Sequence, residues 1–139
     1  VVIVNGTRII SKKVLDSTKA VFINMHTGIT PKYRGVHGGY WAMVNNDTVN
    51  CGVTVHLVDK GIDTGGILYQ ATIPATKNDN YITYPYLQFG EGVPLMYRAV
   101  EDILHDRLAI VQSRIPESAL CYHPTIWQYL YLRIFKGKK

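Results

Sequence analysis

The chain has 139 residues, of which 47% are hydrophobic and 18% are charged, and its formal net charge is +5 at pH 7. This balance excludes an intrinsically disordered chain, and a length within the ~100–200 residues of typical domains predicts one domain, residues 1–139. No apolar run approaches the roughly 18 residues that a transmembrane helix needs, and no secretory signal is recognised, so we expect a cytoplasmic protein without a membrane partner.

The first predicted elements are a strand, a short helix and a second strand. Val1–Val4 is an unbroken run of β-branched residues, which is typical of a strand buried on both faces of a parallel sheet. Ser11 can cap a short helix that ends near Leu15, and the apolar run Ala20–Ile23 predicts the next strand. Because a strand at the first residue lacks a predecessor, we expect a piece of a longer domain whose amino-terminal strands are missing.

A loop and a helix are predicted next. Asn24–Gly35 is rich in Gly, Pro and Thr and has no regular periodicity, so it predicts a loop at the carboxyl end of the second strand. Open α/β sheets bind ligands at that edge. His37–Asn46 has its apolar residues on one helical face, with Gly38 and Gly39 in the first turn of the helix.

The middle of the chain predicts a hairpin followed by a longer helix. Gly52–Val58 and Ile67–Ile73 read as strands, joined by the wide Gly-rich connection Asp59–Gly66. Val93–Leu108 places its apolar residues on one face and should pack on the sheet. Together these elements predict an α/β fold with a mixed sheet and flanking helices.

The carboxyl-terminal segment Cys121–Phe135 is aromatic and apolar, and we expect it to serve packing or a dimer contact. Without zinc-finger spacing or a basic run interleaved with aromatics, no nucleic-acid partner is expected. Cys51 and Cys121 lack metal-ligand spacing, so we expect reduced thiols and no metal. A basic tail can contact anionic ligands, although a solvated, frayed terminus is favoured; it contains Arg133, Lys136, Lys138 and Lys139.

Three residues form the candidate catalytic group: Asn24, His26 and Asp63. In an extended Asn-X-His the two side chains project to the same side and can converge on one ligand atom. An amide and a protonated imidazole suit acyl transfer, because both can stabilise the oxyanion of a tetrahedral intermediate. Asp63 can hold the ring's protonation state and collect the proton that an attacking amine releases. Taken singly, His26 also reads as a structural side chain and Asp63 as a turn residue.

Two motifs connect this group to a known family. Asn24–His26 with Pro31–Gly35 is similar to the Asn-X-His loop and the downstream Pro-Lys-Tyr-X-Gly of the folate-dependent formyltransferases. Gly52–His56, running into the turn Asp63–Gly65, resembles the Gly-Val-Thr-hydrophobic-His strand and the Asp-Thr-Gly turn of the same family. Order and spacing agree, and the resemblance extends over about Val1–Gln70.

The resemblance implies a partial Rossmann-like formyltransferase domain, the carboxyl half of the family's catalytic domain, with 10-formyltetrahydrofolate as co-substrate and no metal. It implies that Asn24 and His26 polarise the formyl carbonyl. It also implies that Asp63, supported by His56, assists proton transfer. The implied folate site has these walls: Gly6, Thr7, Arg8, Ile9, Ile10, Val58, Asp59 and Ile62.

The acceptor is expected to be a primary amine on a small molecule, with an amino-sugar nucleotide favoured over the family's other acceptors, glycinamide ribonucleotide and methionyl-tRNA. The long carboxyl-terminal extension expected of the tRNA enzyme does not follow in this sequence. Two alternatives stay open: a hydrolase that uses water as the acceptor, and a non-catalytic folate-binding or oligomerising fragment.

The sequence departs from the family pattern in two places. Thr27-Gly28 stands where many members of the family have Pro-Ser, and we expect Gly28 to loosen the loop. The first half of the domain, which usually holds the acceptor, is also missing, so either this is a fragment or the acceptor binds otherwise. Because an uncovered sheet edge tends to pair, we expect a homodimer or a partner that supplies the missing half.

Overall fold

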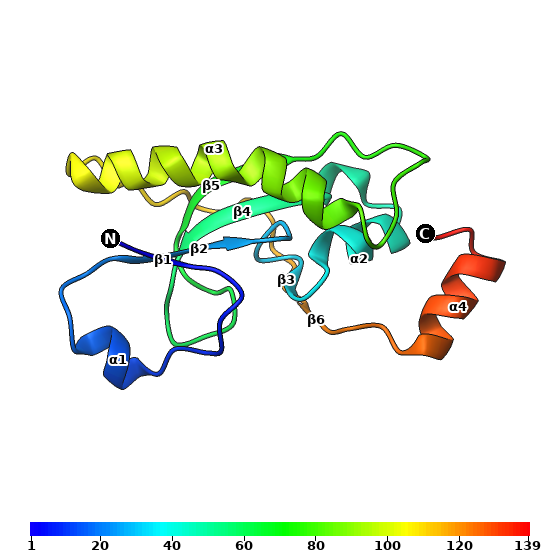
Figure 1. Cartoon of the computed structure of the whole chain (residues 1–139), viewed down its shortest axis with the longest axis horizontal. Helices are drawn as coiled ribbons and strands as arrows, with labels where there is room; N and C mark the ends of the chain where they lie inside the picture. Colours follow the sequence, from blue (N-terminus) through cyan, green and yellow to red (C-terminus); the bar gives the residue numbers. More distant parts are fainter.

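The computed structural model describes all residues, 1–139, and is built around a four-stranded mixed sheet (Figure 1). The strand order is β1-β2-β4-β5, formed by Val2–Val4, Phe22–His26, Gly52–Leu57 and Ile67–Thr72 respectively. β1 and β2 run parallel, whereas β4 is antiparallel to both of its neighbours, β2 and β5. The predicted α/β class with a mixed sheet and flanking helices is therefore confirmed.

The first unit has the predicted strand–helix–strand order. α1 (Lys12–Asp16) is capped by the hydroxyl of Ser11, which accepts from the amide of Val14. The prediction that the first strand is buried on both faces is wrong, because β1 is the edge strand of the sheet. Its successive side chains Val2 and Ile3, which point to opposite faces, are 37% and 57% exposed.

The core lies between the sheet and the long helix α3 (Tyr84–Leu104), which packs on β4 and β5 (Figure 1). Buried side chains of β2, β4 and β5 contact α3 through Met96 and Ala99. The prediction that this helix begins at Val93 is wrong. Pro85 stands in the first turn, where a missing amide hydrogen costs no helical bond, so the helix starts earlier.

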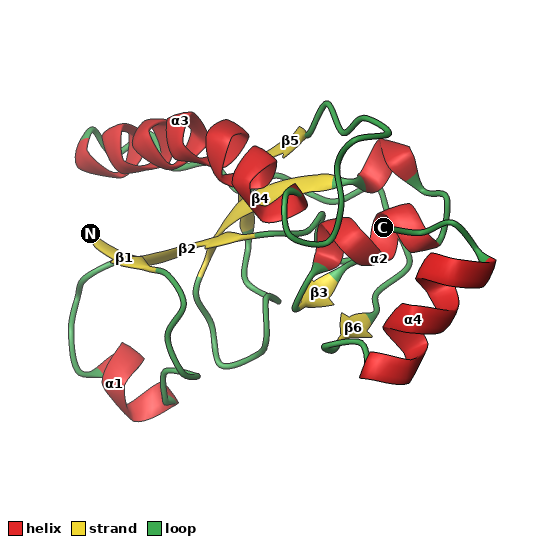
Figure 2. Ribbon diagram, turned by 45° about the vertical axis from the view of Figure 1, so that its right-hand side comes forward, coloured by secondary structure: helices red, strands yellow, loops and turns green.

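A second cluster of buried hydrophobic side chains is built around α2 (Gly38–Val44), which the 3-10 helix η1 (Thr48–Asn50) follows. The two-stranded parallel ribbon of β3 (Arg34–Gly35) and β6 (Leu120–Cys121) lies beside it. Figure 2 shows α4 (Ile126–Phe135) alongside α2. The carboxyl-terminal segment therefore packs on the chain that follows β2, which agrees with packing, one of the two roles expected for it.

Only one side of α4 is covered by the rest of the chain. Its Tyr129 ring meets the Tyr40 and Tyr81 rings, whereas Trp127 and Tyr131 are 77% and 51% exposed. Strand β1 and the uncovered side of α4 are both exposed in the single chain. The homodimer expected from the sequence stays a prediction. No helix in the structure is both long and apolar enough to cross a membrane.

The prediction of a frayed basic tail is wrong for its last residues. Lys138 Nζ donates to the carbonyl of Met43 at 2.9 Å and also to the side chain of Asn46, at the carboxyl end of α2. Lys139 Nζ donates to the carbonyl of Lys77 at 3.0 Å. The last carbonyls of a helix have no intrahelical partner, and a lysine ammonium satisfies one here.

Candidate active site

Strand β2 carries the Asn-X-His motif. The prediction that Asn24 begins a loop is wrong, because the strand continues to His26 and the loop starts at Thr27. The extended backbone places Asn24 and His26 on one face of the sheet. In the antiparallel register Asn24 lies directly opposite His56 of β4, so that three polar side chains gather at the centre of the sheet.

Asp63 reaches this group from the connection between β4 and β5. Its backbone has φ of +51°, a left-handed conformation that is uncommon outside glycine. Carboxylate Oδ2 accepts from the amide of Gly35 at 2.8 Å and lies 3.3 Å from His26 Nδ1. Oδ1 lies 3.4 Å from Asn24 Nδ2 and 3.5 Å from His56 Nε2. The structure thus brings together all three candidate catalytic residues and their proposed support.

The connection that carries Asp63 is held from both sides. Arg34 Nη1 donates to the carbonyl of Ile62 at 3.0 Å, which ties the turn to β3. Within the turn, the carboxylate of Asp59 accepts from the amide of Gly61 at 2.9 Å and from the hydroxyl of Thr64 at 2.7 Å. These contacts fix the left-handed position of Asp63.

His26 is 5% exposed, and both of its ring nitrogens face acceptors. Nε2 lies 2.6 Å from the carbonyl of Tyr33, which can only accept, so Nε2 carries the hydrogen. Burial lowers the pKa of His26, and this outweighs the opposing effects of Asp63 and the Tyr33 carbonyl. The expectation of a protonated ring therefore does not hold for this arrangement, in which the neutral ring is favoured at pH 7.

Asp63 stays ionised. Burial by itself would raise the pKa of Asp63, but the neighbouring imidazoles of His56 and His26 and the amide of Gly35 together hold that pKa below its usual value. Near neutral pH, Nδ1 of His26 and Oδ2 of Asp63 therefore both present lone pairs to each other. The pair gains a hydrogen bond when it takes up one proton, which is the property of a general base.

The amide of Asn24 is turned inward. Its Nδ2 lies 3.2 Å from His56 Nε2 and 3.4 Å from Asp63 Oδ1, so both amide hydrogens are directed at these residues. The His56 tautomer agrees, because His56 Nδ1 lies 2.7 Å from the carbonyl of Leu57 and must carry the hydrogen there. Asn24 can donate to a substrate oxygen only after its amide rotates.

A cleft of about 570 Å³ opens over this group. The residues predicted from the resemblance as folate walls all line it: Gly6, Thr7, Arg8, Ile9, Ile10, Val58, Asp59 and Ile62. They come from the segment after β1 and from the β4–β5 connection, which lie on the same side of the sheet in Figure 1. No cluster of His, Cys, Asp or Glu side chains is arranged to hold a metal ion.

Sequence reasoning missed the opposite end of the cleft. That end is lined by Val36 and His37 after β3 and by Leu120–Tyr122 in and after β6. No motif marks the second segment, which reaches the cleft only because β6 pairs with β3. For Val36 and His37, the available signal was the preceding Pro31–Gly35 motif, since that motif supplies the Tyr33 carbonyl and the Gly35 amide to the site.

Gly28 tightens the loop, so the expectation that it loosens the loop is wrong. A Cβ at this position would lie 2.6 Å from Nε2 of His26 and would overlap the carbonyl of Tyr33. Only glycine leaves room for the hydrogen bond between these two groups. The loop conformation and the orientation of the His26 imidazole are therefore coupled.

We expect the stability of the protein to fall as the pH is lowered from about 7.5 to about 5.5. The folded-state pKa of His26 lies below the ordinary value of 6.5, and so does that of His37. The unfolded chain therefore binds protons first as the pH passes below 6.5, which favours unfolding. Thermal unfolding followed by circular dichroism should show this decline, and His26→Gln should reduce it. An equal decline in the variant would contradict the burial of a neutral His26.

Comparison with known proteins gives one family. Residues 1–85 match the family model described as formyl transferase. A methionyl-tRNA formyltransferase from Thermodesulfovibrio yellowstonii is 30% identical over 90% of this chain and 39% of its own length. The chain thus spans about two fifths of that curated relative.

Solved structures give the same fold. Formyltransferase PseJ from Anoxybacillus kamchatkensis, in complex with UDP-4,6-dideoxy-4-formamido-L-AltNAc and tetrahydrofolate, has a TM-score of 0.75 at 23% identity over 95% of this chain and 68% of its own. An N-formyltransferase from Helicobacter canadensis, in complex with folinic acid and dTDP-3-aminofucose, has a TM-score of 0.68 at 27% identity over 82% of this chain and 41% of its own.

Proposed function

This chain belongs to the formyl transferase family, and we propose that it transfers a formyl group from 10-formyltetrahydrofolate to a primary amine. The observation that carries the proposal is the convergence of Asn24, His26 and Asp63 at one cleft, with the lone pairs of His26 and Asp63 facing each other. The folate compounds bound to the two neighbouring structures support the choice of donor.

The proposed reaction begins when the amine nitrogen attacks the formyl carbon. A carbon–nitrogen bond forms and the formyl oxygen becomes an oxyanion. His26 and Asp63 take up the proton that the amine loses, which completes the hydrogen bond between Nδ1 and Oδ2. When the bond from the formyl carbon to the folate nitrogen breaks, the same proton is delivered to that nitrogen, so the products are a formamide and tetrahydrofolate.

The oxyanion needs hydrogen-bond donors, but both candidate donors point at other acceptors in this structure. The Asn24 amide must rotate away from His56, and the Nε2–H of His26 must exchange the Tyr33 carbonyl for the formyl oxygen. Catalytic hydrogen bonds are often completed only when substrate binds. Binding of the formyl group is therefore proposed to reorganise both contacts.

For the acceptor we propose an amino-sugar nucleotide. The support is the likeness to two formyltransferase structures whose bound ligands are of this class. Methionyl-tRNA is the second candidate, because the curated relative with the stated 30% identity is a methionyl-tRNA formyltransferase. Both acceptors present a primary amine, so the same three residues serve either reaction.

We expect the purified protein to convert dTDP-3-aminofucose to its formamide in the presence of 10-formyltetrahydrofolate. Mass spectrometry of the sugar nucleotide and absorbance of the released tetrahydrofolate measure the reaction. Two parallel reactions distinguish the alternatives. Formylation of methionyl-tRNA would identify the tRNA enzyme, and release of formate with no amine present would identify the hydrolase. If folate binds but no formamide or formate appears with any acceptor, the catalytic proposal is wrong and the non-catalytic alternative holds.

A further inference from the structure

A second group of titratable side chains lies beside the cleft, outside the catalytic group. His37 lines the cleft, directly before α2. Its Nε2 lies 2.5 Å from the hydroxyl of Tyr81 and 3.1 Å from Nδ1 of His123. The Tyr81 ring also lies against the His37 ring, with centroids 4.2 Å apart. Three segments distant in sequence thus meet on one imidazole.

The backbone around this group is specifically arranged. The amide of Val36 donates to the carbonyl of Cys121 at 3.1 Å, and Trp41 Nε1 donates to the carbonyl of Tyr122 at 2.9 Å. Gly35 has φ of +90°, and a Cβ there would overlap the carbonyl of Cys121. The pairing of β3 with β6 therefore holds the His123 segment against His37.

The hydrogen bonds leave one donor of His37 without a partner. Burial, together with the neighbouring His123, lowers the pKa of His37, and burial raises the pKa of Tyr81, so the ring is neutral and the phenol keeps its hydrogen. In the tautomer in which Tyr81 donates to Nε2, the neutral ring carries its own hydrogen on Nδ1. The side chain does not cap the helix that it precedes, and Nδ1 has no hydrogen bond within the chain.

His37 is also held in an uncommon backbone conformation. Four residues other than glycine have positive φ, namely His37, Asn46, Asp63 and Asp106. Of these, only His37 and Asp63 line the cleft. Left-handed conformations of such residues cost free energy and gather at binding and catalytic sites. Gly35, whose amide donates to the Asp63 carboxylate, precedes His37 by two residues. The two left-handed residues that line the cleft are therefore linked through one short segment.

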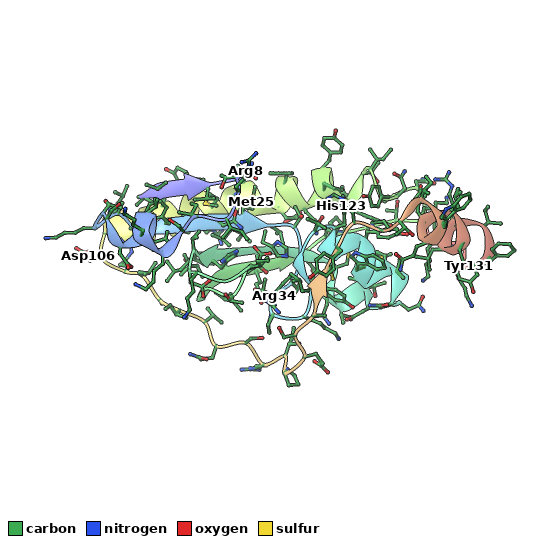
Figure 3. The ribbon with its side chains drawn as sticks, turned by 90° about the horizontal axis from the view of Figure 1, so that it is seen from below. Arg8, Met25, Arg34, Asp106, His123 and Tyr131 are labelled. Atoms are coloured by element: carbon green, nitrogen blue, oxygen red, sulfur yellow. The ribbon has the colours of Figure 1, made fainter.

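The two substrates must approach the catalytic group from different ends of the cleft, because they react at a single carbon. The proposed folate walls and His37 both line the cleft, and His37 contacts His123. Figure 3 shows His123 displaced from Arg8 and Met25 along the long axis of the molecule. On the basis of the proposed formyl transfer, we infer that His37 binds the acceptor: its Nδ1–H donates to an oxygen of the amino-sugar nucleotide, while Tyr81 and His123 position the ring.

The test is direct binding of dTDP-3-aminofucose by calorimetry, with tetrahydrofolate present so that no transfer occurs. His37→Gly removes the side chain and relieves the left-handed backbone, whereas His37→Asn keeps an N–H donor and tolerates that backbone. We expect His37→Gly to weaken sugar-nucleotide binding about 10-fold, as for one lost hydrogen bond to a polar or charged oxygen. His37→Asn should restore most of the affinity. Tetrahydrofolate affinity should not change in either variant.

A parallel titration with dTDP identifies the oxygen. If His37→Gly weakens dTDP binding equally, the contact is to a phosphate or the nucleoside, and if it weakens only dTDP-3-aminofucose, the contact is to the sugar. Equal binding of the sugar nucleotide to wild type and His37→Gly, or no binding to wild type, would overturn the inference. Because these measurements need no turnover, they are independent of the test of formyl transfer.

Tyr81→Phe tests the positioning role. Without the phenol, Nε2 loses the donor that fixes the ring hydrogen on Nδ1. We expect a roughly 3- to 10-fold rise in the KM for the acceptor with little change in kcat or in the KM for the folate. A fall in kcat at unchanged acceptor KM would assign Tyr81 to the packing of the fold instead.

Discussion

His26→Ala is expected to lower the rate of formyl transfer by about 100- to 1000-fold, the usual cost of losing one oxyanion-stabilising donor. In the proposed mechanism the imidazole acts on charge that develops in the transition state, so folate affinity should remain close to that of wild type. Single-turnover rates with 10-formyltetrahydrofolate and equilibrium binding of tetrahydrofolate measure the two quantities separately.

Two controls separate this effect from misfolding. His26→Gln keeps an N–H that can reach the Tyr33 carbonyl but cannot take up a proton beside Asp63, and it should be similarly slow. His105→Ala removes an exposed histidine at the end of α3, outside the cleft, and should leave the rate unchanged. A folded His26→Gln with near wild-type turnover would remove His26 from the mechanism.

The sequence predicted the elements that carry the chemistry better than their surroundings. The hairpin of β4 and β5 and the convergence of two motifs follow from alternation and turn residues, which are local signals. The exposure of β1 is not local, since a β-branched run has the same pattern at the centre and at the edge of a sheet. The early start of α3 at Pro85 was hidden because proline reads as a helix breaker except in the first turn.

Within the site, the sequence identified residue types but not hydrogen-bond directions. The neutral His26 ring depends on burial and on a carbonyl from Tyr33, and neither is visible in the motif. His37 and His123 meet only through the pairing of β3 with β6, across 86 positions. Contacts of that range come from the packing of the whole fold and leave no periodic pattern in the chain.

Asp63→Asn is expected to lower formyl transfer by about 100- to 10,000-fold, the range for loss of a general base. Asparagine tolerates the left-handed backbone of Asp63, and its oxygen can still accept from the Gly35 amide, so the fold should persist. What is lost is the negative charge that lets His26 take up a proton. The rate with dTDP-3-aminofucose and thermal unfolding of the same preparation measure both effects.

The pH dependence gives a second readout, because Asp63 raises the pKa of His26 against the stronger effect of burial. Without the carboxylate that pKa falls further, so the acid limb of kcat/KM in Asp63→Asn should move to lower pH. The matched control is Asp106→Asn, since Asp106 has φ of +54° but is exposed beyond α3, far from the cleft (Figure 3). An acid limb that stays in place in Asp63→Asn, or an equal loss of rate in Asp106→Asn, would show that Asp63 does not share a proton with His26.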